Sequence, residues 1–203
     1  MDVAQELGRT AVTAALHQRH RTEIGTPGPC PVVTTSRLML RPHRLADAGS
    51  LAESLADFAV ARMLARVPQP YDRQDAEDWL QIQLSDAANG WAAAITMGDD
   101  VHIGMVGIEQ RGQSWRVGYW LNRYYWGRGI MTEAVGALLD RFLRRMPESA
   151  IRSGAFADNT ASLKVQQKLG FRVTGCSEMF SLARNGVVPH IDTLIRPEDL
   201  RRL

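Results

Sequence analysis

A glycine-bearing turn between a β-prone run and an amphipathic segment most limits what this 203-residue chain can fold into. A strand is predicted at 117–121 and a helix at 132–145, with Gly127 and Gly129 between them. Glycine lets the backbone turn tightly and bring successive N–H groups towards one point. The first N–H groups of a helix have no partner within it, and the helix dipole is positive there. With Arg128 nearby, this corner is suited to bind an anion such as phosphate.

The turn matches neither of two widespread nucleotide-binding loops. The sequence contains no G-x-x-x-x-G-K-[ST] motif. A dinucleotide-binding loop needs three glycines directly after its strand, whereas Thr132 stands at the third position and five residues separate Leu121 from Gly127. The next predicted strand carries Arg152 and Ser153 where that loop requires an acid. The turn is therefore either a plain strand–helix corner or an anion site of another kind.

The rest of the chain alternates between helical and β-prone segments. Helices are predicted where apolar residues recur at helical spacing, and strands where short β-prone runs are bounded by turn residues. The predicted helices are 46–65, 72–88, 132–145 and 160–169, and the predicted strands are 34–41, 91–97, 101–110, 114–121, 150–157, 172–184 and 189–195. We expect an α/β fold with a mixed, mostly antiparallel sheet of about seven strands and flanking helices.

Composition indicates one globular domain behind an N-terminal extension. Three prolines and a glycine at 26–31 prevent regular structure there. We expect 1–31 to be a helical or flexible extension with a Pro-rich linker, and 32–203 to be a single domain. A net charge of +2 gives no reason to expect nucleic acid. The chain lacks an apolar run of about 18 residues, so no membrane span is expected. Two distant cysteines indicate a reduced, cytoplasmic setting.

Several blocks along the chain together resemble a known family. These blocks are 35–42, 117–121 with 125–134, 159–162 with 168–171, and a last strand that contains Asp192. They are similar, in this order, to motifs of the GNAT acetyltransferases, in the branch that acetylates the N-termini of ribosomal proteins. The resemblance covers about 34–195, and the two central blocks carry most of it.

The resemblance implies a fold, a cosubstrate and its binding residues. Two adjacent parallel strands, 117–121 and 150–157, would splay apart to hold the pantetheine arm of acetyl-CoA. The pyrophosphate would sit on the glycine turn, Asn159 would hold the far side, and Ser162 would lie near the sulfur. The implied cofactor-binding residues are Leu121, Asn122, Trp126, Gly127, Arg128, Gly129, Ile130, Met131, Thr132, Asn159 and Ser162.

Two positions depart from the family pattern. Met131 replaces a small residue, which is expected to move the phosphates slightly. Gln166 stands where many members have a tyrosine that protonates the departing thiolate, and an amide cannot do so. This branch of the family often lacks that tyrosine as well, so the departure does not exclude activity.

Direct attack of an amine on a thioester needs a base for the amine and an acid for the thiolate. Ser162 is the candidate acid. Glu133 and Glu178 are the candidate bases, and Glu109 is a weaker one. Each also has an ordinary explanation: a hydroxyl bonded to its own helix, a carboxylate favoured by a helix dipole, or a solvent-facing strand residue.

Two residue pairs have unsettled roles. Tyr119 and Trp120 alternate in one strand, so one of them faces the cofactor or the acceptor, although aromatic residues there are more often core. His190 and Asp192 have the spacing of a metal-binding pair, but without a third ligand a simple side-chain pair is the better interpretation. No metal is expected.

We therefore expect an acetyl-CoA-dependent N-acetyltransferase, monomeric or homodimeric, acting on a protein N-terminus or a small amine in a ternary complex. One alternative is an aminoglycoside- or polyamine-type acetyltransferase, which an acidic acceptor cleft would favour. Another is a non-catalytic module that binds acyl-CoA as a regulatory ligand. The acidic cleft could come from the predicted helix 72–88, through Asp72, Asp75, Glu77 and Asp78.

Overall fold

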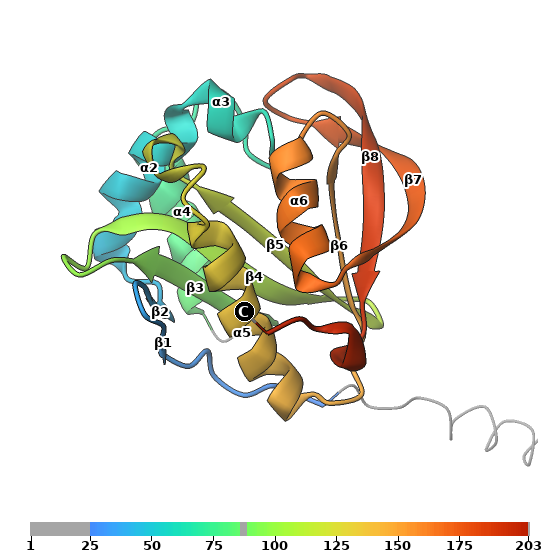
Figure 1. Cartoon of the computed structure of the whole chain (residues 1–203). Coiled ribbons are helices and arrows are strands. Elements are labelled where there is room, and N and C mark those ends of the chain that lie inside the picture. The colour runs from blue at the N-terminus through green and yellow to red at the C-terminus, as the bar shows by residue number, and fades with distance from the viewer. Residues whose placement is uncertain (1–24, 86–88, 203) are drawn as a thin grey trace, which may run out of the picture.

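The computed structural model describes residues 25–85 and 89–202. Its centre is one eight-stranded sheet in the order β1-β2-β3-β4-β5-β6-β8-β7 (Figure 1). Neighbouring strands are antiparallel except for β5 and β6, which are parallel. The strands are β1 (Val33–Thr34), β2 (Met39–Pro42), β3 (Gly90–Thr96), β4 (His102–Arg111), β5 (Ser114–Leu121), β6 (Ile151–Phe156), β7 (Arg172–Ser181) and β8 (Gly186–Ile195).

The expected mixed sheet is confirmed, with one strand more than predicted. The predicted strand 34–41 divides into β1 and β2 because Thr35 makes a turn. Its N–H donates to the carbonyl of Leu38 at 2.9 Å, and its hydroxyl accepts from the N–H of Leu38 at 3.0 Å. The chain therefore reverses at 35–38, and β1 pairs antiparallel with β2.

Helices cover both faces of the sheet. The helices are α2 (Ala48–Ala56), α3 (Phe58–Ala61), α4 (Arg73–Leu84), α5 (Ile130–Arg145) and α6 (Thr160–Leu169), with short 3-10 turns at η1 (Leu45–Asp47), η2 (Arg123–Tyr125) and η3 (Pro197–Asp199). The single helix predicted at 46–65 is wrong. It is interrupted at Asp57, whose extended backbone starts α3 and whose carboxylate accepts from the N–H of Ala59.

Two apolar clusters hold the layers together. On one face, Phe142 of α5 packs edge-on against Trp91 and Trp115, with ring centroids 5.2 and 4.9 Å apart. On the other face, Leu51 of α2 and Leu80 of α4 pack with Trp120. Figure 1 shows α5 and α6 in front of the sheet. Alternate residues of β5 therefore contribute to opposite layers.

The parallel strands β5 and β6 pair only at their start. Their register joins Trp115 to Ile151 and Arg116 to Arg152. Beyond these pairs, the Ser153 hydroxyl donates to the carbonyl of Val117 at 3.1 Å. The strands then separate, which leaves an opening in the middle of the sheet.

The Pro-rich segment lies against the domain. Trp91 Nε1 donates to the carbonyl of Gly28, and Arg145 donates to that of Pro27, both at 2.8 Å. The extension predicted for 1–24 lies outside the described residues. Within 25–85 and 89–202, no helix is long and apolar enough to cross a membrane.

Candidate functional site

The glycine turn presents free backbone N–H groups, as its sequence predicts. Gly127 and Gly129 both have φ of 75°, a left-handed conformation that glycine adopts without strain. The first hydrogen bond into α5 runs from the N–H of Glu133 to the carbonyl of Gly129 at 3.1 Å. The N–H groups of the residues between them, Ile130 to Thr132, precede that bond and have no carbonyl of the helix to reach. A Cβ on Gly127 would meet no described atom within 4 Å, so the turn has open space beside it.

Side chains around the turn keep it in place. Trp126 Nε1 donates to the carbonyl of Leu121 at 2.7 Å. Asn122 accepts from the N–H of Tyr124 and donates to the Ser54 hydroxyl at 2.9 Å, which ties the turn to α2. The turn is therefore anchored at the end of β5.

Met131 does not crowd the turn, contrary to the expectation from its size. Its side chain lies in the core cluster beneath α5, together with that of Ile130. These two residues therefore contribute their backbone N–H groups to the turn, and their side chains point into the core.

Glu133, a candidate base, instead joins the turn to the bend between β1 and β2. Its carboxylate accepts from Thr35 at 2.6 Å and from two nitrogens of Arg37 at 2.8 and 2.6 Å. Arg37 also donates to the carbonyl of Arg128 at 3.1 Å. Partial burial raises the pKa of Glu133, but these hydrogen bonds outweigh it and hold the pKa below its usual value. A carboxylate held in this way is a weak proton acceptor.

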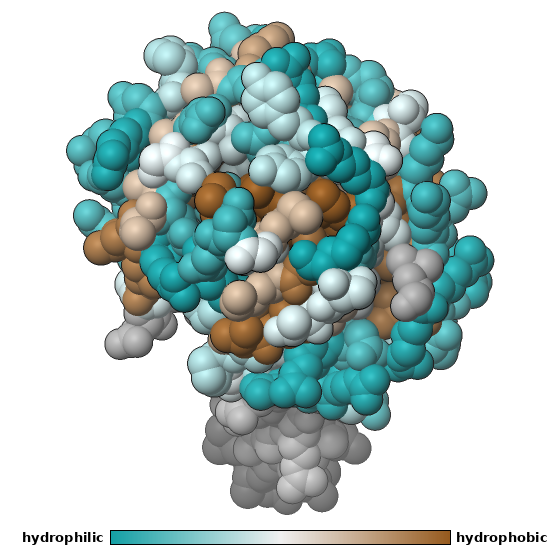
Figure 2. Space-filling view, turned by 60° about the vertical axis from the view of Figure 1, so that its left-hand side comes forward, coloured by the Kyte–Doolittle hydropathy of each residue, from teal (hydrophilic) through white to brown (hydrophobic). Residues whose placement is uncertain are grey.

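A cleft of about 890 Å³ lies over the opposite face of the sheet and continues into the opening between β5 and β6. Its floor consists of Ala92, Gly107 and Gly118, which are cross-strand partners on β3, β4 and β5. These residues have almost no side chain, so a ligand can lie close to the sheet. Figure 2 shows hydrophobic side chains in the middle of one face, among hydrophilic ones.

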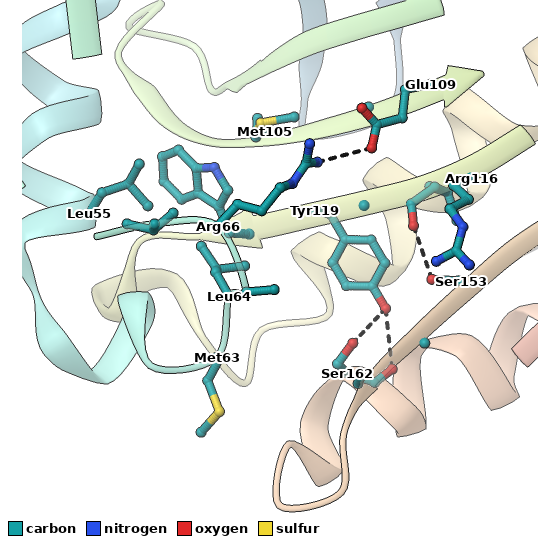
Figure 3. A pocket seen from close by; sticks show the side chains of 18 of the residues that line it. Leu55, Met63, Leu64, Arg66, Met105, Glu109, Arg116, Tyr119, Ser153 and Ser162 are labelled. Atoms are coloured by element: carbon teal, nitrogen blue, oxygen red, sulfur yellow. Dashed lines mark hydrogen bonds and ion pairs between the residues drawn. The ribbon is translucent and has the colours of Figure 1, made fainter. Parts of the chain in front are cut away.

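One wall of the cleft is apolar and the other is charged. Leu55, Leu64 and Met105 line the apolar wall. On the charged side, Arg66 reaches over the cleft to Glu109 at 2.9 Å (Figure 3). Glu109, the weaker candidate base, therefore lines the cleft but is held in an ion pair.

A hydrogen-bonded cluster lies where the cleft enters the opening. The Tyr119 hydroxyl is 2.9 Å from Ser162 Oγ, and Gln166 Nε2 is 3.2 Å from both oxygens (Figure 3 shows Tyr119 pointing at Ser162). Thr193 donates to Gln166 Oε1 at 2.7 Å, and Gln166 Nε2 also donates to the carbonyl of Gly154 at 3.1 Å. These two bonds determine which end of the amide is nitrogen.

Either hydroxyl can be the donor in the contact between Tyr119 and Ser162, and the Tyr119 hydroxyl also lies 3.3 Å from the carbonyl of Ser162. When Tyr119 donates to Ser162 Oγ, the proton of Ser162 remains for a group in the cleft. Burial raises the pKa of Tyr119, although its bonds with Ser162 and Gln166 oppose this, and the phenol stays protonated. Of the two adjacent aromatic residues, Tyr119 therefore faces α6 and Trp120 faces α2.

The remaining site residues fall into two groups. Asn159 lines the cleft and caps α6, because its side chain accepts from the N–H of Ser162 at 3.1 Å. Glu178, the other candidate base, is exposed on β7 opposite Pro189 and is not among the residues that line the cleft. The structure therefore brings Asn159 and Ser162 together, whereas Glu178 lies apart from them.

His190 forms the side-chain pair with Asp192 that the sequence predicts. Its ring is buried at the edge of the cleft, and its Nδ1 lies 3.1 Å from a carboxylate oxygen of Asp192. The H-x-D spacing was the available signal. Among the described residues, no cluster of three or more His, Cys, Asp or Glu side chains could hold a metal.

The comparison with protein families decides what this arrangement is. Residues 37–172 match the acetyltransferase (GNAT) domain, which covers the glycine turn, the opening and α6. The chain belongs to the GNAT acetyltransferase family. As an N-acetyltransferase, it transfers an acetyl group to an amine.

Relatives and solved structures agree with this assignment. The chain is 29% identical over 161 residues to an uncharacterized N-acetyltransferase, p20, of Bacillus licheniformis, spanning 76% of this chain and 89% of the relative. It is 33% identical over 110 residues to a probable N-acetyltransferase, YjcK, of Bacillus subtilis, spanning 51% and 60%.

Two solved GNAT structures share the fold. A ribosomal-protein-S5-alanine acetyltransferase from Vibrio fischeri superposes with a TM-score of 0.71 at 20% identity, covering 84% of this chain and 99% of that one. Mycobacterium smegmatis RimJ, in complex with CoA-disulfide, superposes with a TM-score of 0.69 at 22% identity, covering 80% and 83%.

Proposed function

We propose that this GNAT enzyme transfers the acetyl group of acetyl-CoA to a primary amine, on a protein N-terminus or a small molecule, by direct attack in a ternary complex. The observation that carries the proposal is the position of Ser162. Ser162 lines the cleft at the opening between β5 and β6, and the glycine turn follows the end of β5, one of the two strands that border this opening.

The glycine turn is the proposed pyrophosphate site. Its free N–H groups and the side chain of Arg128 supply positive charge, and the dipole of the 16-residue helix α5 adds to it. The pantetheine arm would follow β5 near Leu121 and Asn122. Asn159 and Ser162 would contact the part of the cosubstrate that enters the opening.

Ser162 is the proposed acid. In the proposed arrangement Tyr119 is the donor to Ser162 Oγ, which leaves the Ser162 proton for a group in the cleft. A hydroxyl placed in this way can donate to the sulfur as the carbon–sulfur bond breaks. Gln166, where the family tyrosine is missing, therefore orients the donor rather than acting as one.

The charge of the cleft favours a peptide N-terminus over a polycation. Its carboxylates and arginines are two acids and three arginines: Asp75, Glu109, Arg66, Arg111 and Arg116. A net positive lining repels an aminoglycoside or a polyamine. The other three acids that the sequence suggested for an acidic cleft, Asp72, Glu77 and Asp78, do not line it. The flat floor suits an extended chain, and the names of the S5-alanine acetyltransferase and RimJ point to the same kind of acceptor.

The pyrophosphate assignment is tested by a matched pair of variants, Gly129→Asp and Gly129→Asn. Both side chains have nearly the same shape, and asparagine and aspartate tolerate a positive φ better than other residues. Only the aspartate puts a negative charge among the N–H groups. Calorimetric titration with acetyl-CoA should show binding to Gly129→Asn and at least a tenfold weaker affinity for Gly129→Asp, corresponding to about 1.4 kcal/mol. Equal affinities would remove the pyrophosphate from this turn.

Turnover distinguishes the enzyme from a regulatory module. Thiol release should be followed with peptides, aminoglycosides and polyamines as acceptors. Release with peptides supports the proposal, and preference for polyamines or aminoglycosides would contradict the acceptor assignment. Binding of acetyl-CoA without release on any acceptor would favour the regulatory alternative.

A further inference from the structure

The described residues contain an oriented histidine on the acceptor side of the sheet that no part of the proposed chemistry uses. His190 and Asp192 lie on β8 opposite Phe156 and Gly154 of β6. Thr193, the next residue after Asp192, faces α6 and donates to Gln166. Successive strand residues face opposite sides, so His190 and Asp192 face the cleft side of the sheet.

The geometry of the pair is that of a base held by a carboxylate. Nδ1 of His190 lies 3.1 Å from Asp192, and a carboxylate there favours the tautomer with the proton on Nδ1. Nε2 is then the nitrogen that can accept a proton. Nε2 makes no hydrogen bond within the described residues. It is also absent from the fully buried polar atoms that lack a partner there, so it is accessible from the cleft that His190 lines.

Gly154 places this histidine next to the proposed acid. A Cβ on Gly154 would overlap the His190 ring, so the ring occupies the space where other residues carry a side chain. On the other face of the strand, the carbonyl of Gly154 accepts from Gln166, which also binds Ser162. One strand residue therefore separates the histidine from the group that orients the acid.

The carboxylates suggested by the sequence do not offer such a site. Glu133 is bound by Arg37 away from the cleft, Glu178 is exposed, and Glu109 is paired with Arg66. We infer that His190 is the general base of the transfer and that Asp192 is its positioning residue. This inference rests on the proposed function and adds the group that makes the acceptor amine reactive.

The proton balance is complete. The acceptor enters as an ammonium ion with three protons. His190 Nε2 takes one proton, and the neutral nitrogen forms a bond to the thioester carbon. The carbon–sulfur bond then breaks, and its electron pair leaves on sulfur. The sulfur takes a second proton through Ser162, while the amide keeps the third. The imidazolium returns its proton to solvent.

The test compares His190→Gln with the wild type at two pH values. At pH 7 the α-amine of a peptide, with a pKa of about 8, is mostly protonated, so the variant should lose about 100-fold in kcat/KM. At pH 9.5 the amine is already neutral and the deficit should shrink to less than about tenfold. The ionisable group in contact with His190 is Asp192, since the facing residues Gly154, Phe156 and Ser177 carry no charge.

Three further variants give the controls. Asp192→Asn should lower kcat by about tenfold at unchanged affinity for acetyl-CoA, because the imidazole loses its orientation. Glu178→Gln, the rival base, should retain wild-type activity. Ser177→Ala, beside His190 on β7, should also be active and shows that disturbance of the neighbouring strand is harmless.

The outcomes separate this inference from the proposed function. If the wild type turns over and His190→Gln keeps its activity at pH 7, the inference is overturned and the transferase remains. A deficit that is the same at both pH values, or lost acetyl-CoA affinity in both His190→Gln and Asp192→Asn, makes the role structural and also overturns it. A wild type that binds acetyl-CoA without any turnover contradicts the proposed function itself.

Discussion

His102 makes the stability of this fold sensitive to mild acid. Its side chain is buried at the start of β4, beside His43 at 5.3 Å and Trp120 at 5.5 Å between ring centroids. Neither ring nitrogen of His102 has a partner among the described residues. A protonated imidazole would therefore carry a buried charge without a hydrogen-bond partner among the described residues.

The pKa gives the size and direction of the effect. Burial lowers the pKa of His102 from 6.5 to about 4; His43 and Arg41 add to this, while Asp47 opposes it. The unfolded chain binds the proton at higher pH than the folded one. Stability is therefore full above pH 6.5, falls as the pH drops through this window, and reaches its lower limit below about pH 4. A shift of this size corresponds to about 3 kcal/mol.

The measurement is urea unfolding at pH 7.5 and pH 4.5 for the wild type and for His102→Phe. Phenylalanine keeps an aromatic ring beside Trp120 but cannot be protonated. Between the two pH values, the wild type should lose about 2 to 3 kcal/mol more than the variant. Parallel losses in both proteins would show that His102 does not bear the acid sensitivity. The test also concerns function, because Trp120 lines the cleft.

Three further predictions follow from buried or bound charges. Burial raises the pKa of Cys30 to about 11, so at pH 8 only the exposed Cys176 should react rapidly with an aromatic disulfide; two fast thiols would contradict this. Asp47→Asn removes one of the two carboxylates of the buried Arg41, bonded to Asp47 at 2.8 Å and to Asp100 at 2.7 Å, and should cost about 2 kcal/mol of unfolding free energy, whereas a loss below about 0.5 would refute it. Glu133→Gln should weaken acetyl-CoA binding several-fold in calorimetry without lowering kcat, and a 100-fold fall in kcat would restore Glu133 as a base.

Local patterns in the sequence were sufficient for the turn and for most elements. Gly127 and Gly129 adopt the positive φ expected of them, and Gly170 ends α6 with φ of 104°, as its position after a predicted helix indicates. The break at Asp57 was missed because the apolar spacing continues through it. The carboxylate of Asp57 caps α3 and so interrupts the helix at a point where the sequence has no glycine or proline.

The catalytic groups were harder to predict because their environment comes from distant segments. The role of Glu133 depends on Arg37, 96 residues earlier in the chain, and no local pattern records that pair. His190 was visible as part of H-x-D, but its orientation follows from the pairing of β8 with β6. Gly154 leaves space for the His190 ring, and this follows only from the register in which β6 pairs with β8.

The opening between β5 and β6 explains why the proposed acid and base can act on one substrate. Two residues beyond the last backbone pair on each strand stand Gly118 and Gly154. A Cβ on Gly118 would meet no described atom within 4 Å, so the space beside Gly118 is free. The corresponding space beside Gly154 is occupied by the His190 ring. One side of the opening is thus left clear for a thioester, and the other carries the histidine. Ser162 approaches the same opening from the α6 face, so the proposed acid and the proposed base would act from opposite faces of the sheet and would not compete for one space.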